Sequence, residues 1–199
     1  MPPKVLFSKE EIVSSAVKLV RSHGIDGLTA RSLAAALHCS VKPIFGYFST
    51  MEELKNAVIA AANEIYLGYL KNSVKSDAYP PYKATGMAYI LFARNERELF
   101  KLLFMRDRTG EPPTKADETE ALIGLIMKGT GLSKEQAYLL HLETWIFVHG
   151  IATMIATGYL VWDEEFISRA LTDCYRGLIA KFKDGQKDDS QTKTGAIKQ

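Results

Sequence analysis

The chain has 199 residues, enough for one large domain or two modest ones. Hydrophobic residues make up 47% of it and charged residues 24%, as in an average soluble globular protein. No uninterrupted apolar run is long enough for a membrane span, and the first residues lack the apolar stretch of a signal peptide. We therefore expect a cytoplasmic protein. The two cysteines, Cys39 and Cys174, are far apart, so neither a disulfide framework nor a cysteine metal site is predicted.

The net charge of +2 lies entirely in residues 1–60, which hold seven Lys or Arg and five Asp or Glu residues. The sign suits a nucleic-acid partner, but the excess is small. A basic surface would have to come from the arrangement of the residues, because the composition does not supply it.

The chain begins with a predicted helix from residue 9 to about residue 23. Ser8 and Glu11 have the spacing of a capping box, and Gly24 supplies the positive φ that often ends a helix. Apolar residues recur at helical spacing along it. This helix would be a scaffold for the elements that follow.

Residues 28–50 read as two short helices joined by a tight turn. Thr29 can cap the first helix, and His38-Cys39 breaks it. Ser40 is the expected N-cap of the second helix, which runs through Tyr47. Thr50 and Glu53 then form a capping box for a third helix. This spacing fits a DNA-binding helix-turn-helix.

The alternative is that the helix-turn-helix is an ordinary packing corner. Against it, the second helix gives little to a core beyond Ile44 and Phe48. It leaves Lys42, Pro43, Phe45 and Tyr47 outside.

The rest of the chain is also predicted to be helical, without strands or repeats, so the fold class is all-α with about nine helices. A long helix follows from residue 51 to about residue 74, and its apolar residues suggest that two cores share it. Pro80-Pro81 ends that segment. Later helices are expected over 82–105 with a break at 94–96, over 117–128, over 133–157 and over 163–182. Residues 184–199 are polar and are expected to be a disordered tail.

Three segments resemble the TetR/AcrR family of repressors. They are Leu28 to Ala34, Ser40 to Phe48, and Met51 to Leu54. The segment Trp145 to Gly150 is similar to a Trp-x-x-x-His-Gly signature of one class of ligand-binding domains in that family. The chain departs from the family pattern in three places: His38 stands where a turn glycine is usual, Phe45 where Tyr is usual, and Met51 where a phosphate-contacting Lys is common.

The resemblance implies a helix-turn-helix DNA-binding domain over 1–50, linked by the shared helix 51–74 to a ligand-binding and dimerisation domain over 51–183. It also implies a homodimer through the last two helices, about 133–157 and 163–182. The residues alone favour the same interface, because the helix from Ser133 is apolar on more than one face. A two-fold dimer predicts a pseudo-palindromic operator.

Roles at the DNA follow from position in the motif. Phosphate contacts are expected from Thr29, Ser40 and Tyr47, while Arg31 would reach a phosphate or a base edge. Lys42 and Pro43 would lie nearest the bases. Lys can donate to guanine, and Pro43 and Phe45 can pack on thymine methyls.

A small, largely apolar ligand is expected in the larger domain. Its candidate contacts are Tyr66, Phe92, Phe100, Phe104, Met105, Trp145 and His149. The alternative is core packing, which is the usual role of an aromatic or Met stripe at helical spacing. His141 and His149 lie two helical turns apart, but no acidic or cysteine partner recurs at ligand spacing, so we expect neither a metal nor a cofactor.

The predicted function is a ligand-responsive transcriptional regulator, most simply a repressor released by its ligand. Ligand binding would shift the helix 51–74 and change the spacing of the two reading helices.

Two alternative functions remain open. A helical enzyme would need a nucleophile and base, or paired carboxylates, and no such set recurs here. A helical protein-interaction module without DNA binding would use the same fold.

Overall fold

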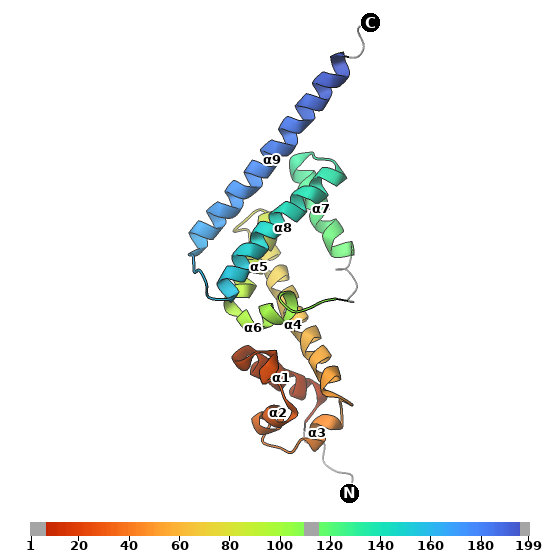
Figure 1. Ribbon diagram of the computed structural model, residues 1–199, viewed down its shortest axis with the longest axis vertical. Helices are drawn as coiled ribbons and strands as arrows, with labels where there is room; N and C mark the ends of the chain where they lie inside the picture. Colours follow the sequence, from red (N-terminus) through yellow and green to blue (C-terminus); the bar gives the residue numbers. More distant parts are fainter. Residues whose placement is uncertain (1–6, 110–115, 196–199) are drawn as a thin grey trace. The chain divides into compact units, whose positions relative to one another are not determined.

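The computed structural model describes residues 7–109 and 116–195, which form nine α-helices and one 3₁₀ helix with no strand (Figure 1). This confirms the predicted all-α class. The elements are α1 (Lys9–His23), η1 (Ile25–Gly27), α2 (Ala30–Ala36), α3 (Lys42–Phe45), α4 (Met51–Lys75), α5 (Pro81–Asn95), α6 (Arg97–Phe104), α7 (Ala116–Thr130), α8 (Lys134–Ala156) and α9 (Glu164–Gly195).

The chain divides into two compact units. The first comprises residues 1–72 and 91–108, and the second comprises residues 73–90 and 109–199. The division therefore falls inside α5, whose first ten residues belong to the second unit and whose last five belong to the first.

Most helices begin where side-chain caps predict. The Ser8 hydroxyl accepts from the amide of Glu11, and the Glu11 carboxylate accepts from the Ser8 amide at 2.7 Å. Ser133 and Gln136 repeat the arrangement at α8. At α9, Asp163 Oδ1 accepts from the amide of Phe166 at 2.7 Å. Each cap satisfies backbone donors that a helix start leaves unpaired.

Two details around the second and third helices differ from expectation. Ser40 is not the N-cap of α3: Val41 holds that position, in helical conformation and without a side-chain cap bond. At α4, the Thr50 hydroxyl accepts from the amide of Glu53 and so caps the helix as predicted. The Glu53 carboxylate, however, accepts from the amide of Ser49 rather than from that of Thr50. Helix α3 has only four residues, so the turn before it, rather than a side-chain cap, fixes where it starts.

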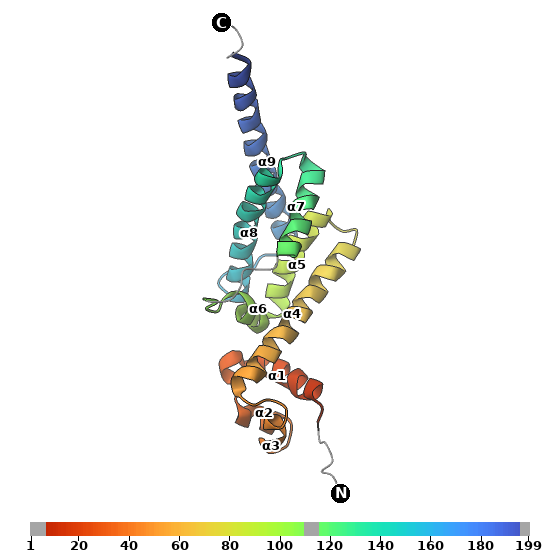
Figure 2. The ribbon, with the colours of Figure 1, turned by 90° about the vertical axis from the view of Figure 1, so that its right-hand side faces the viewer.

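The core of the first unit is built from one face of α1 and the helices packed on it. Figures 1 and 2 show α1, α2 and α3 grouped beside the first part of α4. The fully buried residues have under 2% of their surface exposed and come from all four helices and the loop after α3; they include Ile12, Val20, Leu33, Ile44, Phe48, Leu54 and Val58. Helix α1 packs against both α2 and α6.

The second half of α4 also packs within the first unit. Tyr66 and Tyr69 lie 5.3 Å and 5.4 Å from the ring of Phe92, centroid to centroid. The rings of this second half therefore meet residues of α5 and α6, and the residues of α4 up to Asn72 cluster with the first unit. That two cores share α4 stays a prediction. The same ring contacts join Phe92 at the end of α5 and Phe104 on α6 to the first unit.

The second unit contains α7, α8, α9 and the first part of α5. Its core includes Ile123, Ile126, Leu132, Ala137 and Leu140, against which side chains of α5 and α9 pack. Lys83 of α5 donates to Ser168 Oγ at 2.7 Å and to Thr172 Oγ1 at 2.8 Å, tying α5 to α9.

Helix α9 is longer than predicted. It continues through residues 184–195, where the sequence indicates a polar disordered tail, while residues 196–199 lie outside the described part of the chain. Extending an established helix by one residue is far easier than starting a new one, so a polar segment without proline can continue it.

Candidate DNA-binding and ligand-binding sites

The helix-turn-helix is formed by α2, α3 and the turn between them. Thr29 Oγ1 accepts from the amide of Ser32 at 3.0 Å, so Thr29 caps α2 as predicted. His38 follows α2 with φ of 52°, the left-handed conformation, at the position where the family resemblance leads us to expect a glycine. This turn sends the chain from α2 into α3.

Helix α3 buries one face and exposes the other. Ile44 is completely buried and Phe48 is 1% exposed, whereas Phe45 is 45% and Tyr47 is 38% exposed. Lys42 is also exposed, and Pro43 is half-buried. Phe45 on α3 and Tyr47 in the turn after it are large side chains exposed close together, which indicates a contact surface.

The remaining predicted DNA-contact residues lie on the same motif. Thr29 and Arg31 are exposed at the start of α2, and Ser40 is exposed in the turn before α3. The positions on α3 and these three lie within one supersecondary element, so they are geometrically compatible with one contact surface. Their roles stay predictions.

The predicted ligand residues fall into two separate groups. In the first unit Tyr66, Phe92, Phe100 and Phe104 form an aromatic cluster, and Phe104 lies 5.2 Å from Tyr66 and 5.1 Å from Phe100 between ring centroids. Phe92 and Phe100 are completely buried. Tyr69, which the prediction omitted, belongs to the cluster through Phe92; its position one helical turn from Tyr66 is the signal that could have identified it.

In the second unit Trp145 and His149 stack, with ring centroids 5.2 Å apart and planes 16° from parallel. Tyr89, which was also missed, shares a 2.8 Å hydrogen bond with His149 Nδ1. Nothing in the sequence pairs two residues 60 positions apart. Met105 lies 40% exposed at the end of α6, in the first unit.

Histidine–tyrosine pairs connect α5 to α8 in the second unit. Tyr82 Oη lies 3.0 Å from His141 Nδ1, in the same arrangement as Tyr89 and His149. Burial lowers the pKa of both histidines and raises the pKa of Tyr82. These are the expected directions for groups whose charged forms lose solvent. Among the described residues no group of three or more His, Cys, Asp or Glu side chains could hold a metal ion.

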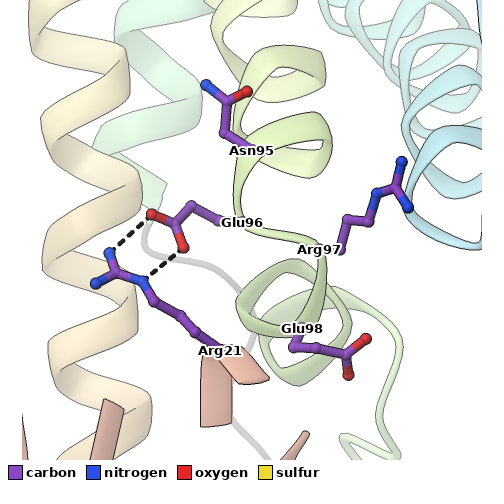
Figure 3. A pocket seen from close by; sticks show the side chains of 5 residues that line it. All are labelled: Arg21, Asn95, Glu96, Arg97 and Glu98. Atoms are coloured by element: carbon purple, nitrogen blue, oxygen red, sulfur yellow. Dashed lines mark hydrogen bonds and ion pairs between the residues drawn. The ribbon is translucent and has the colours of Figure 1, made fainter. Parts of the chain in front are cut away.

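The first unit also contains a small polar pocket of about 170 Å³ where α1 meets the junction of α5 and α6. Its lining residues are Arg21, Asn95, Glu96, Arg97 and Glu98. Figure 3 shows the Arg21 guanidinium facing the Glu96 carboxylate, to which it donates two hydrogen bonds of 2.7 Å. The hydrogen bonding to Glu96 raises the pKa of Arg21.

The chain is all-α, with an exposed helix-turn-helix near its start and a second helical unit built mostly from its later residues. This architecture is typical of a two-domain DNA-binding regulator. Comparison with known proteins identifies the family. Residues 12–58 match the bacterial regulatory proteins of the tetR family, and residues 82–177 match the Tetracyclin repressor-like C-terminal domain. The chain belongs to the TetR family of transcriptional regulators.

Individual relatives agree with this assignment. An uncharacterized HTH-type transcriptional regulator of Mycobacterium tuberculosis is 25% identical over 185 residues, covering 87% of this chain and 81% of that protein. A TetR-family structure from Streptomyces coelicolor A3 superposes with a TM-score of 0.58 at 20% identity, over 83% of this chain and 96% of that one.

A further solved structure has a bound ligand. TetR-Q116A from Acinetobacter baumannii AYE, in complex with minocycline, superposes with a TM-score of 0.54 at 18% identity, over 89% of this chain and 97% of that one. At such identities the two solved structures support the fold.

Proposed function

We propose that this TetR-family protein is a ligand-responsive repressor that binds a pseudo-palindromic DNA operator as a homodimer. The observation that carries the proposal is the two-sided exposure of α3 and the turn after it: Ile44 is buried, whereas Phe45 on α3 and Tyr47 in the turn are exposed. A helix held by one buried face and presenting the other can enter the major groove.

Specific residues have specific roles in this proposal. Lys42 donates to guanine O6 and N7, and Pro43 and Phe45 pack on thymine methyl groups. Thr29, Ser40 and Tyr47 contact phosphates and set the register, while Arg31 reaches a phosphate or a base edge. The role of Ser40 does not compete with helix capping, because Val41 rather than Ser40 occupies the N-cap position of α3.

Dimerisation through α8 and α9 is supported by a broad exposed apolar surface. A single copy leaves large apolar side chains of α8, α9 and the segment between them more than one third exposed; they include Tyr138, Leu139, Leu142, Trp145, Ile146, Phe147, Met154, Tyr159, Val161 and Phe166. Helix α8 is also long and apolar enough to cross a membrane by length and composition, a test that a helix buried between protein subunits passes equally. A second copy would cover this surface, and its second α3 would read the other half-site about one helical turn (~34 Å) or a multiple away.

A small, largely apolar effector is supported by the aromatic residues. The candidate contacts fall into two sets: Tyr66, Phe92, Phe100, Phe104 and Met105 in the first unit, and Trp145 and His149 in the second. The Acinetobacter structure, which contains minocycline, is a precedent for a small-molecule ligand in this fold. Effector and operator binding oppose each other, so each must weaken the other by the same factor.

The proposal places the protein in the cytoplasm, where a DNA-binding regulator meets its operator, and assigns it no cofactor, metal or catalytic activity. A helical protein-interaction module without DNA binding is the alternative. It predicts that changes on α3 leave partner binding unaltered.

Selection of DNA fragments from the source genome by purified protein tests the proposal. We expect wild-type protein to enrich one or a few pseudo-palindromic sites, and Lys42→Ala/Tyr47→Ala to enrich none. Lys128→Ala, which removes an exposed lysine from α7, is the control and should behave as wild type. Equal, unselective recovery by wild type and the double variant would contradict the proposal and favour the interaction module.

A further inference from the structure

Arg21 and Glu96 form a bidentate ion pair between α1 and the junction of α5 with α6. Arg21 Nε and one terminal guanidinium nitrogen each donate to a different Glu96 oxygen, both at 2.7 Å. The Glu96 side chain is 13% exposed, compared with 41% for Arg21. Two parallel charge-assisted hydrogen bonds fix orientation as well as distance, and the limited exposure of Glu96 reduces screening by water.

The backbone of Glu96 is held by two members of the aromatic cluster. Its amide donates to the carbonyl of Phe92 at 2.8 Å, and its carbonyl accepts from the amide of Phe100 at 2.8 Å. Glu96 is the N-cap of α6, where the chain leaves α5 with φ of −124° and ψ of 51°. Glu96 is thus hydrogen-bonded along the backbone to two residues whose rings belong to the aromatic cluster.

Arg21 lies at the other end of the contact, in the last turn of α1. The helix ends three residues later at Gly24, whose amide donates to the carbonyl of Val20 at 2.8 Å. The chain then passes through η1 directly into α2, which packs on α1. Arg21 thus lies on the helix that packs against α2, one of the two helices of the helix-turn-helix.

A second carboxylate on α6, that of Glu98, also lies close to the end of α1. Glu98 pairs with Lys101 Nζ at 2.6 Å within α6. Its carboxylate also approaches Gly24, where an added Cβ would lie 3.0 Å from Glu98 Oε2. The α1 terminus thus fits closely against α6, and the Arg21–Glu96 pair ties the two helices together in that fit.

We infer that Arg21 and Glu96 are positioning residues that join the aromatic cluster to the helix-turn-helix, so that a change in the cluster alters operator affinity through this pair. The inference rests on the proposed function and assigns it a route of regulation. Neither residue contacts the DNA or the effector in this account.

The first test needs no DNA. Amide hydrogen exchange is measured on purified full-length wild type, Glu96→Gln, and the charge-swapped Arg21→Glu/Glu96→Arg. We expect Glu96→Gln to speed exchange in the last turn of α1 by at least about threefold, and the swapped pair to restore slow exchange. Glu120→Gln removes one carboxylate from the Lys134–Glu120 ion pair of α7 and α8 and should leave α1 unchanged.

The second test is a double-mutant cycle on operator affinity. Phe104→Leu perturbs the aromatic cluster, and its effect is compared in wild type and in the Glu96→Gln variant, using the DNA fragment that wild type selects. We expect Phe104→Leu to change affinity at least about threefold when Glu96 is present and much less when Glu96→Gln is also introduced, because only contacting or connected sites are non-additive. Thermal unfolding of each variant separates this from a general loss of folding.

The outcomes separate the inference from the proposed function. Unchanged exchange in Glu96→Gln, or additive effects in the cycle, would overturn the inference while leaving DNA binding intact. Absence of selective DNA binding by wild type would overturn the proposed function, and the inferred route of regulation with it. In that case the exchange result would still decide whether the pair holds α1 to α6.

Discussion

At the scale of single residues, the turn of the helix-turn-helix carries an unusual backbone conformation. His38 adopts φ of 52°, in the left-handed region that is unfavourable for residues with a Cβ atom. We predict that His38→Gly stabilises the protein by about 0.5–1 kcal/mol, since glycine reaches this conformation with little steric penalty. Urea unfolding followed by circular dichroism measures the change.

Ala35→Gly is the matched control for that substitution. Ala35 is exposed inside α2, where glycine should cost about 1 kcal/mol because it loses more conformational entropy. Destabilisation by His38→Gly comparable to that of Ala35→Gly would mean that the His38 side chain contributes more than its backbone costs.

His141 makes the stability of the second unit depend on pH. Burial lowers its pKa in the folded protein, so the unfolded chain takes up the proton first as the pH falls. Stability should therefore be fully present above about pH 6.5, the ordinary histidine pKa, and decline below it. His141→Gln can still accept a hydrogen bond from Tyr82 but cannot titrate.

We predict that unfolding midpoints in urea fall less between about pH 7.5 and about pH 5.5 for His141→Gln than for wild type. Part of the dependence should survive, because burial lowers the pKa of His149 as well. Identical pH dependence in the two proteins would show that His141 does not contribute.

At the scale of elements, local signals predicted the helices well. Ser8, Thr29, Thr50, Ser133 and Asp163 all accept hydrogen bonds from the expected backbone amides, because capping depends on neighbours within a few residues. The predicted break between α5 and α6 is also present. What local signals could not give was the start of α3, which a four-residue helix leaves to the surrounding turn.

Ser133 and Ser40 test the difference between a serine that caps a helix and one that does not. We predict that Ser133→Ala lowers the free energy of unfolding by about 1 kcal/mol, since it removes the hydroxyl that accepts from Gln136. Ser40→Ala should change it by less than about 0.5 kcal/mol, because Ser40 does not cap α3. Urea titrations of both variants provide the values, and an equal loss for the two serines would restore Ser40 as a cap.

Long-range packing limits how much of the candidate sites can be predicted from the sequence. The exposure of Lys42 and Phe45 follows from helical spacing, because the buried Ile44 and Phe48 lie four residues apart on the opposite face. Tyr47 is exposed in the turn after α3, which helical spacing from Ile44 does not predict. The grouping of the ligand residues could not be predicted, because Tyr66 meets Phe92 and Tyr89 meets His149 across tens of residues. The Arg21–Glu96 pair, 75 residues apart, carries no sequence pattern at all.

At the scale of the whole molecule, the exposed apolar surface of α8 and α9 is the proposed dimer interface. Ile146 is 65% exposed in one copy. We predict that Ile146→Glu produces monomers, because a dimer would bury an unpaired carboxylate. Sedimentation velocity measures the assembly state. Val74→Glu, at an apolar position 55% exposed on α4, is the control and should remain dimeric.

Assembly and operator binding should fail together. A monomer carries one reading helix and so loses the second half-site, which makes binding to a palindromic fragment weaker in Ile146→Glu than in Val74→Glu. A dimeric Ile146→Glu would contradict an interface centred on this face of α8.

The central claim is that α3 reads a DNA sequence. The most direct measurement compares the affinities of wild type and Lys42→Ala/Tyr47→Ala for the selected fragment and for the same duplex with scrambled half-sites, at one salt concentration. Wild type should prefer the selected fragment by at least about 10³-fold, and the double variant should lose most of that preference while keeping its salt-dependent binding to both. A double variant that keeps the full preference would contradict the claim.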